Sequence, residues 1–204
     1  MIRMFTWMKN IVNTYLMGKA INSIAKKRKN PMAAVSLVWG SIFASGLQFN
    51  WGIRFVSKEV ISGGKEIGLK INAPGAVFAT IPKFCCVLVC LENLEEATKG
   101  MKNNDWARVV IQGIVHEFRH ALQDEYFEAI GLDADYVLKY IASKYKYLNS
   151  PVEEDAIQFS RNLIVYSKNG CPKIKSSFIK VSEAMKEVAE EVRQHPQVFD
   201  YKKA

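Results

Sequence analysis

The chain is poor in the residues that mark several classes of protein. Its 204 residues include only 4 cysteines, 12 glycines and 6 prolines, too few for a disulfide-dense mini-protein or a collagen-like chain. Hydrophobic residues make up 49% and charged residues 24% of the chain, which excludes an intrinsically disordered protein. No internal repeat or low-complexity segment is present. This length and composition predict one globular domain with a substantial core.

Acidic residues are missing from the first 58 positions. Nine basic residues precede Glu59, the first acidic residue, so that 19 basic and 20 acidic residues remain in 59–204. The net charge of +8 for the whole chain therefore describes the N-terminal region, because the rest carries a net charge of −1. This uneven distribution of charge argues against interpreting the whole chain as a basic DNA-binding domain.

The basic N-terminal region has the pattern of an amphipathic helix. Apolar residues recur at steps of three and four over residues 4–16, and the stretch ends in the basic residues 26–29 before Pro31. This helix could dock on the domain with a solvated basic end, or it could contact an anionic membrane or nucleic acid. A targeting peptide is a third interpretation, although Lys9 interrupts the apolar run. We therefore divide the chain into an arm, 1–30, and a single domain, 31–204.

Residues 31–53 contain no charged side chain. The run is long enough to span a bilayer, in which case the basic residues before it would stay in the cytoplasm. It also contains three glycines and several serine and amide side chains, which are costly in hydrocarbon. These residues favour buried strands and turns over a membrane span.

The cysteines lack metal-binding spacing. No C-x-x-C pair occurs, which excludes a zinc ribbon. Cys85, Cys86 and Cys90 lie in an apolar run, 84–91, that predicts a buried strand. Cys86 and Cys90 would share a face about 13 Å apart, too far for one disulfide or one metal. Free buried thiols favour a reducing compartment, so we expect a cytoplasmic protein, with membrane association as the alternative.

Two of the three histidines form an H-E-x-x-H motif, His116 to His120. The motif lies in a predicted helix that begins after Asp105 as N-cap and stops before Gly131. Residues four apart share a helix face, so both imidazoles could bind one Zn²⁺. Glu117 is rotated by about 100°, which suits a general base acting on a zinc-bound water whose pKa falls to about 7. The alternative is a pair of ordinary buried histidines with partners of their own.

A third protein ligand is needed, and histidine does not supply it. Position 126 is Tyr126, which excludes the metzincin pattern. The best source of a carboxylate is the acidic segment 150–156, predicted to be a helix capped by Ser150 and running to about residue 167. Glu153 is our choice, with the alternatives that it completes a capping box with Ser150 or that Glu154 binds instead.

The residues 116–123, together with 151–156, resemble the small gluzincins, which are zinc metallopeptidases often encoded by bacteria and phages. The resemblance covers about residues 105–168. It implies a zincin-like α+β fold, with a small mixed β-sheet, two zinc-bearing helices and here an additional N-terminal amphipathic helix. It also implies that His116, His120 and Glu153 bind zinc and that Glu117 is the general base.

The resemblance further implies that an edge strand binds the substrate backbone by strand addition, with residues 76–80 or 84–91 as candidates. Gln123 matches a common family position without a role that we can state. An oxyanion donor is also expected, and the sequence offers no basis for choosing among the tyrosines Tyr136, Tyr140, Tyr145, Tyr147 and Tyr166.

The predicted function is a zinc-dependent metallopeptidase that hydrolyses bonds in a peptide or protein substrate. One alternative is a zincin-like protein that binds zinc with little activity. The other is a membrane- or nucleic-acid-associated protein that acts through residues 1–30. We expect Arg119 to lie on the helix surface or in a salt bridge, and residues 181–194 to form an amphipathic helix with a solvated charged face.

Overall fold

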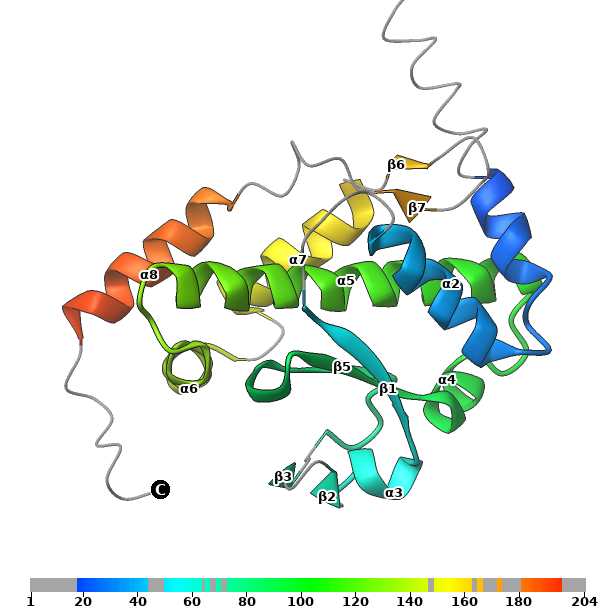
Figure 1. Cartoon of the computed structure of the whole chain (residues 1–204), viewed down its shortest axis with the longest axis horizontal. Helices are drawn as coiled ribbons and strands as arrows, with labels where there is room; N and C mark the ends of the chain where they lie inside the picture. The colour runs from blue at the N-terminus through cyan, green and yellow to red at the C-terminus, as the bar shows by residue number, and fades with distance from the viewer. Residues whose placement is uncertain are drawn as a thin grey trace, which may run out of the picture.

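Most of the described strands lie in the first half of the chain, and four helices within residues 91–162, α4 to α7, follow them in succession (Figure 1). The computed structural model describes residues 18–43, 50–63, 65–66, 69–70, 73–146, 149–162, 165–166, 172–173 and 181–195. The helices are a segment at residues 18–25, α2 (Pro31–Phe43), α3 (Lys58–Ile61), the 3-10 helix η1 (Pro82–Phe84), α4 (Leu91–Ala97), α5 (Asn103–Ala129), α6 (Ala134–Lys144), α7 (Pro151–Asn162) and α8 (Glu183–Gln194). The strands are β1 (Gly52–Val56), β2 (Lys65–Glu66), β3 (Leu69–Lys70), β4 (Phe78–Ile81), β5 (Cys86–Cys90), β6 (Val165–Tyr166) and β7 (Pro172–Lys173). The predicted α+β class is confirmed.

The largest sheet has three strands in the order β1-β5-β4. Strand β1 runs parallel to β5, and β4 runs antiparallel to it, so the sheet is small and mixed as predicted. The run 84–91 was one of two candidates for the substrate-binding edge, but β5 is the central strand and this candidate is wrong. Strand β4, which overlaps the other candidate, is at the edge among the described strands.

Strand β5 is buried on both faces, as the apolar run predicted. All five of its residues are buried, with Val87 and Val89 on one face and Cys86, Leu88 and Cys90 on the other. This alternation is the period of two that a strand imposes. The strand begins two residues later than predicted, because residue 85 adopts a left-handed backbone conformation with φ 45° after η1. Cys85, Cys86 and Cys90 are free thiols; Cys86 and Cys90 are buried as expected, but Cys85 is exposed, so the expectation of burial is wrong for it.

Helix α5 crosses the middle of the molecule, with the sheet on one side of it (Figure 1). Its 27 residues correspond to a length of about 40 Å. Asp105 was expected at the N-cap, but Lys102 occupies that position and Asp105 lies in the first turn, where a carboxylate still interacts favourably with the helix dipole. Gly131 follows the helix with φ 78°, so the predicted C-terminal stop is confirmed.

A glycine brings the sheet close to α5. A Cβ atom built at Gly113 would lie 2.3 Å from Cε2 of Phe78 on β4, far inside van der Waals contact. The absence of a side chain at this position lets the edge strand approach the helix one turn before His116. Gly113 therefore makes room for the Phe78 ring to pack against α5.

Residues 31–43 of the uncharged run form helix α2 where strands and turns were expected, whereas the last two residues of the run begin strand β1 as a strand prediction requires. Asn30 caps α2 by accepting a hydrogen bond from the Ala33 amide at 3.1 Å, and Pro31 occupies the first position. The buried residues recur at steps of three and four, namely Ala34, Val35, Val38, Trp39 and Ile42. Helical burial of this face outweighed the glycine and serine content on which the prediction was based. Residues 44–49 lie outside the described part of the run.

The described part of the N-terminal arm packs against the domain. In the helical segment 18–25, the apolar residues are buried together with α2 and α5. Arg28 donates hydrogen bonds to the carbonyl of Met101 at 2.5 Å and to the side chain of Asn103 at 3.0 Å. This basic residue is therefore held by the loop before α5. The expected helical pattern over residues 4–16 lies outside the described residues.

The described residues form three hydrophobic clusters, of which the two largest share α5 and α7, while the third lies on the other face of β5. The first core contains the N-terminal two thirds of α5, residues 18–25, α2, one face of β5, and Phe159 of α7. The second core contains Phe127 of α5, Val152 of α7, and the inner faces of α6 and α8. The predicted C-terminal amphipathic helix is confirmed as α8, which Ser182 caps.

The second motif helix is shorter than expected. Helix α7 ends at Asn162 and strand β6 follows at Val165, so the predicted extension to about residue 167 is wrong. Its predicted start is confirmed, because Ser150 accepts a hydrogen bond from the Glu153 amide at 3.2 Å and Pro151 is the first helical residue. Within the described segments, every helix is too short or too polar to cross a bilayer.

Candidate metal centre

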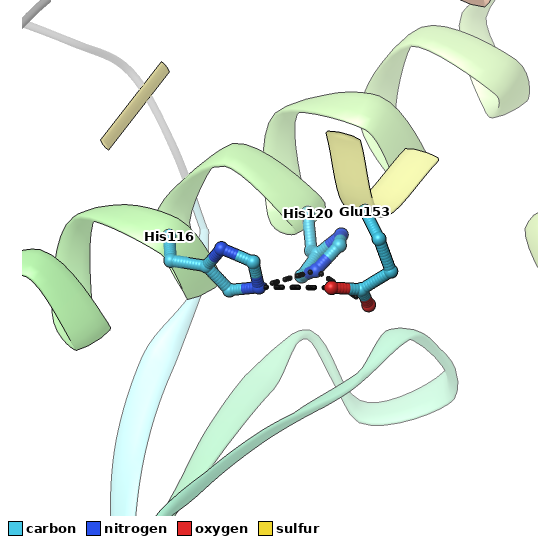
Figure 2. A group of neighbouring side chains, drawn as sticks. All are labelled: His116, His120 and Glu153. Carbon is cyan, nitrogen blue, oxygen red and sulfur yellow. Dashed lines mark hydrogen bonds and ion pairs between the residues drawn. The ribbon is translucent and has the colours of Figure 1, made fainter. Parts of the chain in front are cut away.

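Three side chains from the two motif helices meet at one point (Figure 2). His116 and His120 project from successive turns of α5, and Glu153 reaches them from α7. The two Nε2 atoms are 3.0 Å apart. Oε2 of Glu153 lies 3.3 Å from Nε2 of His116, and its Oε1 lies 3.2 Å from Nε2 of His120. The structure therefore brings together the three residues that the sequence predicted as metal ligands.

These separations fit a tetrahedral metal ion. Bonds of about 2.0–2.2 Å from zinc to nitrogen and oxygen place neighbouring ligand atoms about 3.3–3.5 Å apart in a tetrahedron. The Nε2–Nε2 separation is 3.0 Å, and the separations from Nε2 to the carboxylate are 3.2 and 3.3 Å, each to a different oxygen of Glu153. They are close to that range, and one donor atom from each residue lies within 4.8 Å of the others. Two imidazoles and one carboxylate also form a donor set that leaves a fourth position open.

The helix geometry selects Glu153 among the three acidic residues of α7. Glu153 is buried with 5% of its surface exposed, and both of its carboxylate oxygens face the histidines. Glu154 is exposed and accepts a hydrogen bond from Gln158. Asp155 pairs with Arg119. Ser150 accepts a hydrogen bond from the Glu153 amide, which is one of the two interactions of a capping box. The Glu153 carboxylate, which would make the other interaction, faces the histidines.

Glu117 lies beside this group and is held by the edge strand. It is 8% exposed, and the hydroxyl of Thr80 on β4 donates a hydrogen bond of 2.6 Å to its Oε2. A donated hydrogen bond fixes the carboxylate while leaving its other oxygen available. Thr80 was missed in the sequence, since it lies 37 residues before Glu117 and no local pattern connects the two.

Gln123 fixes the orientation of His120. Its amide nitrogen donates to the carbonyl of Val152 at 3.0 Å and to Oδ2 of Asp155 at 2.7 Å. Its Oε1 is therefore left to accept a hydrogen bond from Nδ1 of His120, at 2.8 Å. This arrangement puts a proton on Nδ1 and directs Nε2 towards Glu153, which is how a metal-binding histidine is usually oriented. The geometry thus gives a role to a position for which the sequence indicated none.

Arg119 ties the two motif helices together behind the site. Its Nε donates to Oδ2 of Asp155 at 2.6 Å and its Nη2 to Oδ1 at 3.1 Å. The guanidinium also lies 4.9 Å from the ring centroid of Phe159. Arg119 is 4% exposed, so the expected salt bridge is confirmed and the expected surface position is wrong. Burial raises the pKa of Asp155, but the hydrogen bonds and charge of Arg119 hold it below its ordinary value.

His120 binds its second proton tightly in the absence of metal. Burial lowers the pKa of this imidazole, but the hydrogen bond with Glu153 and the charge of Glu117 raise it to about 9. Cationic imidazole and carboxylate therefore neutralise each other where a metal ion would stand. A metal ion must displace this proton, because only neutral imidazole coordinates.

A cavity of about 410 Å³ opens beside the group. Glu117, His120 and Glu153 line one part, the edge strand β4 lines a second, and α6 lines a third. Of the five candidate tyrosines, Tyr145 lines the cavity. Tyr136 and Tyr140 donate their hydroxyls to the His195 carbonyl and to Glu191, and Tyr147 and the side chain of Tyr166 lie outside the described residues.

Asp124 continues the same face of α5 one turn beyond His120 and also lines the cavity. Only 4% of its surface is exposed. Burial raises the pKa of Asp124 to about 7, and the charges of Asp135, Glu128 and Glu125 act in the same direction, against the effect of His120. No motif or spacing in the sequence marks this residue.

The third histidine is not part of this centre. His195 follows α8 and stacks on Tyr140, with ring centroids 6.2 Å apart. Comparison with protein-family models, with curated proteins and with solved structures finds no match to this chain. The chemistry of the site therefore rests on its own geometry.

Proposed function

We propose that the chain is a zinc-dependent metallopeptidase with a zincin-like arrangement of its motif helices. The observation that carries the proposal is the convergence of His116, His120 and Glu153 within hydrogen-bonding distance of one another, with Glu117 beside them. Zinc bound there would polarise the substrate carbonyl and lower the pKa of a coordinated water to about 7.

Glu117 is the proposed general base of this reaction. Its carboxylate takes the proton from the attacking water and passes it to the leaving amine. The hydrogen bond from Thr80 orients the carboxylate, so Thr80 is a positioning residue. Tyr145 is the tyrosine of the cavity wall, and we propose its hydroxyl as the donor that stabilises the oxyanion.

The edge strand supports a peptide as the substrate. Residues of β4 line the cavity, and β4 has β5 on one side only among the described strands. An extended peptide could add to the other side of β4 through backbone hydrogen bonds. Its scissile bond would then pass Thr80 and the carboxylate of Glu117, which Thr80 contacts.

The test compares zinc-loaded wild type with Glu117→Gln. We expect about one zinc per chain in both proteins, because Glu117 is not a ligand, and cleavage reduced by about 10²- to 10⁴-fold in the variant. Zinc is measured by inductively coupled plasma mass spectrometry, and cleavage by mass spectrometry of a proteome-derived peptide library.

Glu154→Gln is the matched control, since it removes an exposed carboxylate next to the ligand Glu153. It should retain both zinc and cleavage. Wild-type protein without stoichiometric zinc would overturn the metal site. Stoichiometric zinc without any cleavage would instead support a zinc-binding protein that lacks peptidase activity.

A further inference from the structure

The cavity extends beyond the metal centre to a buried carboxylate. His120 and Asp124 are four residues apart on α5, which places them on one face about 6 Å apart. Both line the cavity, and between them and α6 the wall is apolar, formed in part by Leu138, Ile141 and Ala142. We call this part of the cavity, from His120 to Asp124 along the apolar wall of α6, the apolar passage. His120 of the metal centre lies at one end, and Asp124 lies one helical turn further along α5.

One oxygen of the Asp124 carboxylate lacks a hydrogen-bond partner among the described residues. Its Oδ2 is fully buried and has no hydrogen bond to any described residue. A buried polar atom without a partner is costly and rare in folded proteins, so each case calls for an explanation. Because Asp124 lines the cavity, a ligand that enters the cavity can supply a donor to this carboxylate.

Further carboxylates surround the outer side of Asp124. A second cavity, of about 530 Å³, is lined by one basic residue, Lys83, by Asp124 and by four other acidic residues, Glu125, Glu128, Asp133 and Asp135. Three of them already accept hydrogen bonds, from the Trp51 indole, the Ala134 amide and the Tyr136 amide respectively. Their charges nevertheless make this end of the passage negative, which attracts a cationic group.

We propose that this passage is a subsite for a lysine or arginine side chain of the substrate, next to the cleaved bond, with Asp124 receiving the cationic head. Lysine and arginine bury their methylene stems along apolar surfaces and keep the charged head with polar partners. The four-carbon stem of lysine suits a carboxylate one helical turn from the metal ligands. This inference rests on the proposed peptidase function, because the site is a substrate subsite only if the protein cleaves peptides.

Peptide binding tests the subsite without requiring cleavage. The probes are two N-acetylated, C-amidated pentapeptides of alanine that carry either lysine or norleucine at the centre. Norleucine keeps the apolar stem and lacks the amine. Their affinities for zinc-loaded Glu117→Gln protein are measured by isothermal titration calorimetry. The lysine peptide should bind about 10- to 100-fold more tightly, as expected for a hydrogen bond between charged groups.

Asp124→Asn should reduce that ratio to within about twofold, and Asp124→Leu serves as a second variant. Asp105→Asn is the matched control, because it removes an exposed carboxylate from the first turn of the same helix, outside both cavities, and should preserve the ratio. Zinc content and circular dichroism show whether each variant is folded. A lysine peptide that binds no better than the norleucine peptide, or not at all, overturns the proposal.

Two further measurements distinguish a side-chain subsite from an α-amine site and from the peptidase activity itself. A norleucine peptide with a free N-terminus that binds more tightly than the acetylated lysine peptide would assign Asp124 to an α-amine and overturn the side-chain subsite. In the proteome-derived library, wild-type cleavage without enrichment of lysine or arginine beside the cut would overturn the subsite and leave the peptidase standing. If wild type does not cleave, the peptidase fails and the binding ratio still decides the subsite.

Discussion

At the scale of single residues, the centre depends on how its histidines are held. Gln123 bridges α5 and α7 while it accepts a hydrogen bond from His120. Partners of this kind fix the tautomer and ring orientation of a metal ligand. The function of the motif therefore depends on a neutral side chain outside the H-E-x-x-H spacing.

Gln123→Ala should weaken zinc binding by about 10- to 100-fold, the usual effect of removing an outer-shell partner of a histidine ligand. The affinity is measured by competition with a chromophoric chelator. Gln158→Ala is the control, since Gln158 is an exposed glutamine on α7 whose side chain donates to the exposed Glu154. Equal zinc affinity in the Gln123 variant and wild type would show that the hydrogen bond to His120 does not orient the ligand.

Residue spacing predicted the centre better than it predicted its surroundings. His116, His120 and Glu153 were found because a helix places residues four apart on one face and because Ser150 and Pro151 mark a helix start. Thr80 and Asp124 could not be found in that way. The contact of Thr80 with Glu117 depends on sheet-to-helix packing, and the importance of Asp124 appears only from its burial and the cavity beside it.

At the scale of elements, the pairing of α5 with α7 determines the position of Glu153. The Arg119–Asp155 ion pair lies behind the site, and both partners are largely buried, with side-chain exposures of 4% and 11%. Breaking a buried pair by removing one member leaves an uncompensated charge. The pair therefore fixes the two helices in register and makes each partner dependent on the other.

Asp155→Ala should lower the free energy of unfolding by about 3–5 kcal/mol, because the guanidinium of Arg119 stays buried without its carboxylate. Urea unfolding followed by circular dichroism measures this change. The double variant Arg119→Met, Asp155→Leu should recover most of the loss, since apolar residues of similar volume often replace such a pair at little cost. A loss below about 1 kcal/mol in Asp155→Ala would show that the pair is solvated.

Several element boundaries followed tertiary packing and could not be predicted from local signals. Helix α2 forms in a segment with serine and glycine because one face is buried against α5. Its Ser41 hydroxyl returns to the carbonyl of Leu37 at 2.6 Å, so a residue that favours turns is satisfied inside the helix. Helices α4 and α6 were not predicted at all, whereas α8 followed from its regular charge pattern.

At the scale of the whole molecule, the stability of the metal-free protein should depend on pH through His120. The pKa of His120 is about 9 in the folded chain and about 6.5 in an unfolded one. A group whose pKa is raised by folding stabilises the fold fully below its unfolded pKa, and this contribution is lost as the pH rises through the folded pKa.

The free energy of unfolding should therefore fall between about pH 6.5 and pH 9, by at most about 1.4 kcal/mol per pH unit. Urea unfolding in the presence of a chelator measures it at several pH values. Glu153→Gln should flatten the dependence, because the carboxylate that raises the pKa of His120 is removed. A profile that rises over this interval would contradict the assignment.

The two hydrophobic cores meet at the metal centre. His116, Glu117 and His120 alternate along α5 with the last residues of the first core, Phe118 and Ala121. Phe127 belongs to the second core, and of the α7 residues Phe159 lies in the first core and Val152 in the second. A metal ion bound by residues of α5 and α7 would link the part of the protein built around the first core to the part built around the second core. Unfolding would then become a single cooperative event. Without the ion, the half built from α6 and α8 is free to open by itself and to exchange its amide hydrogens first.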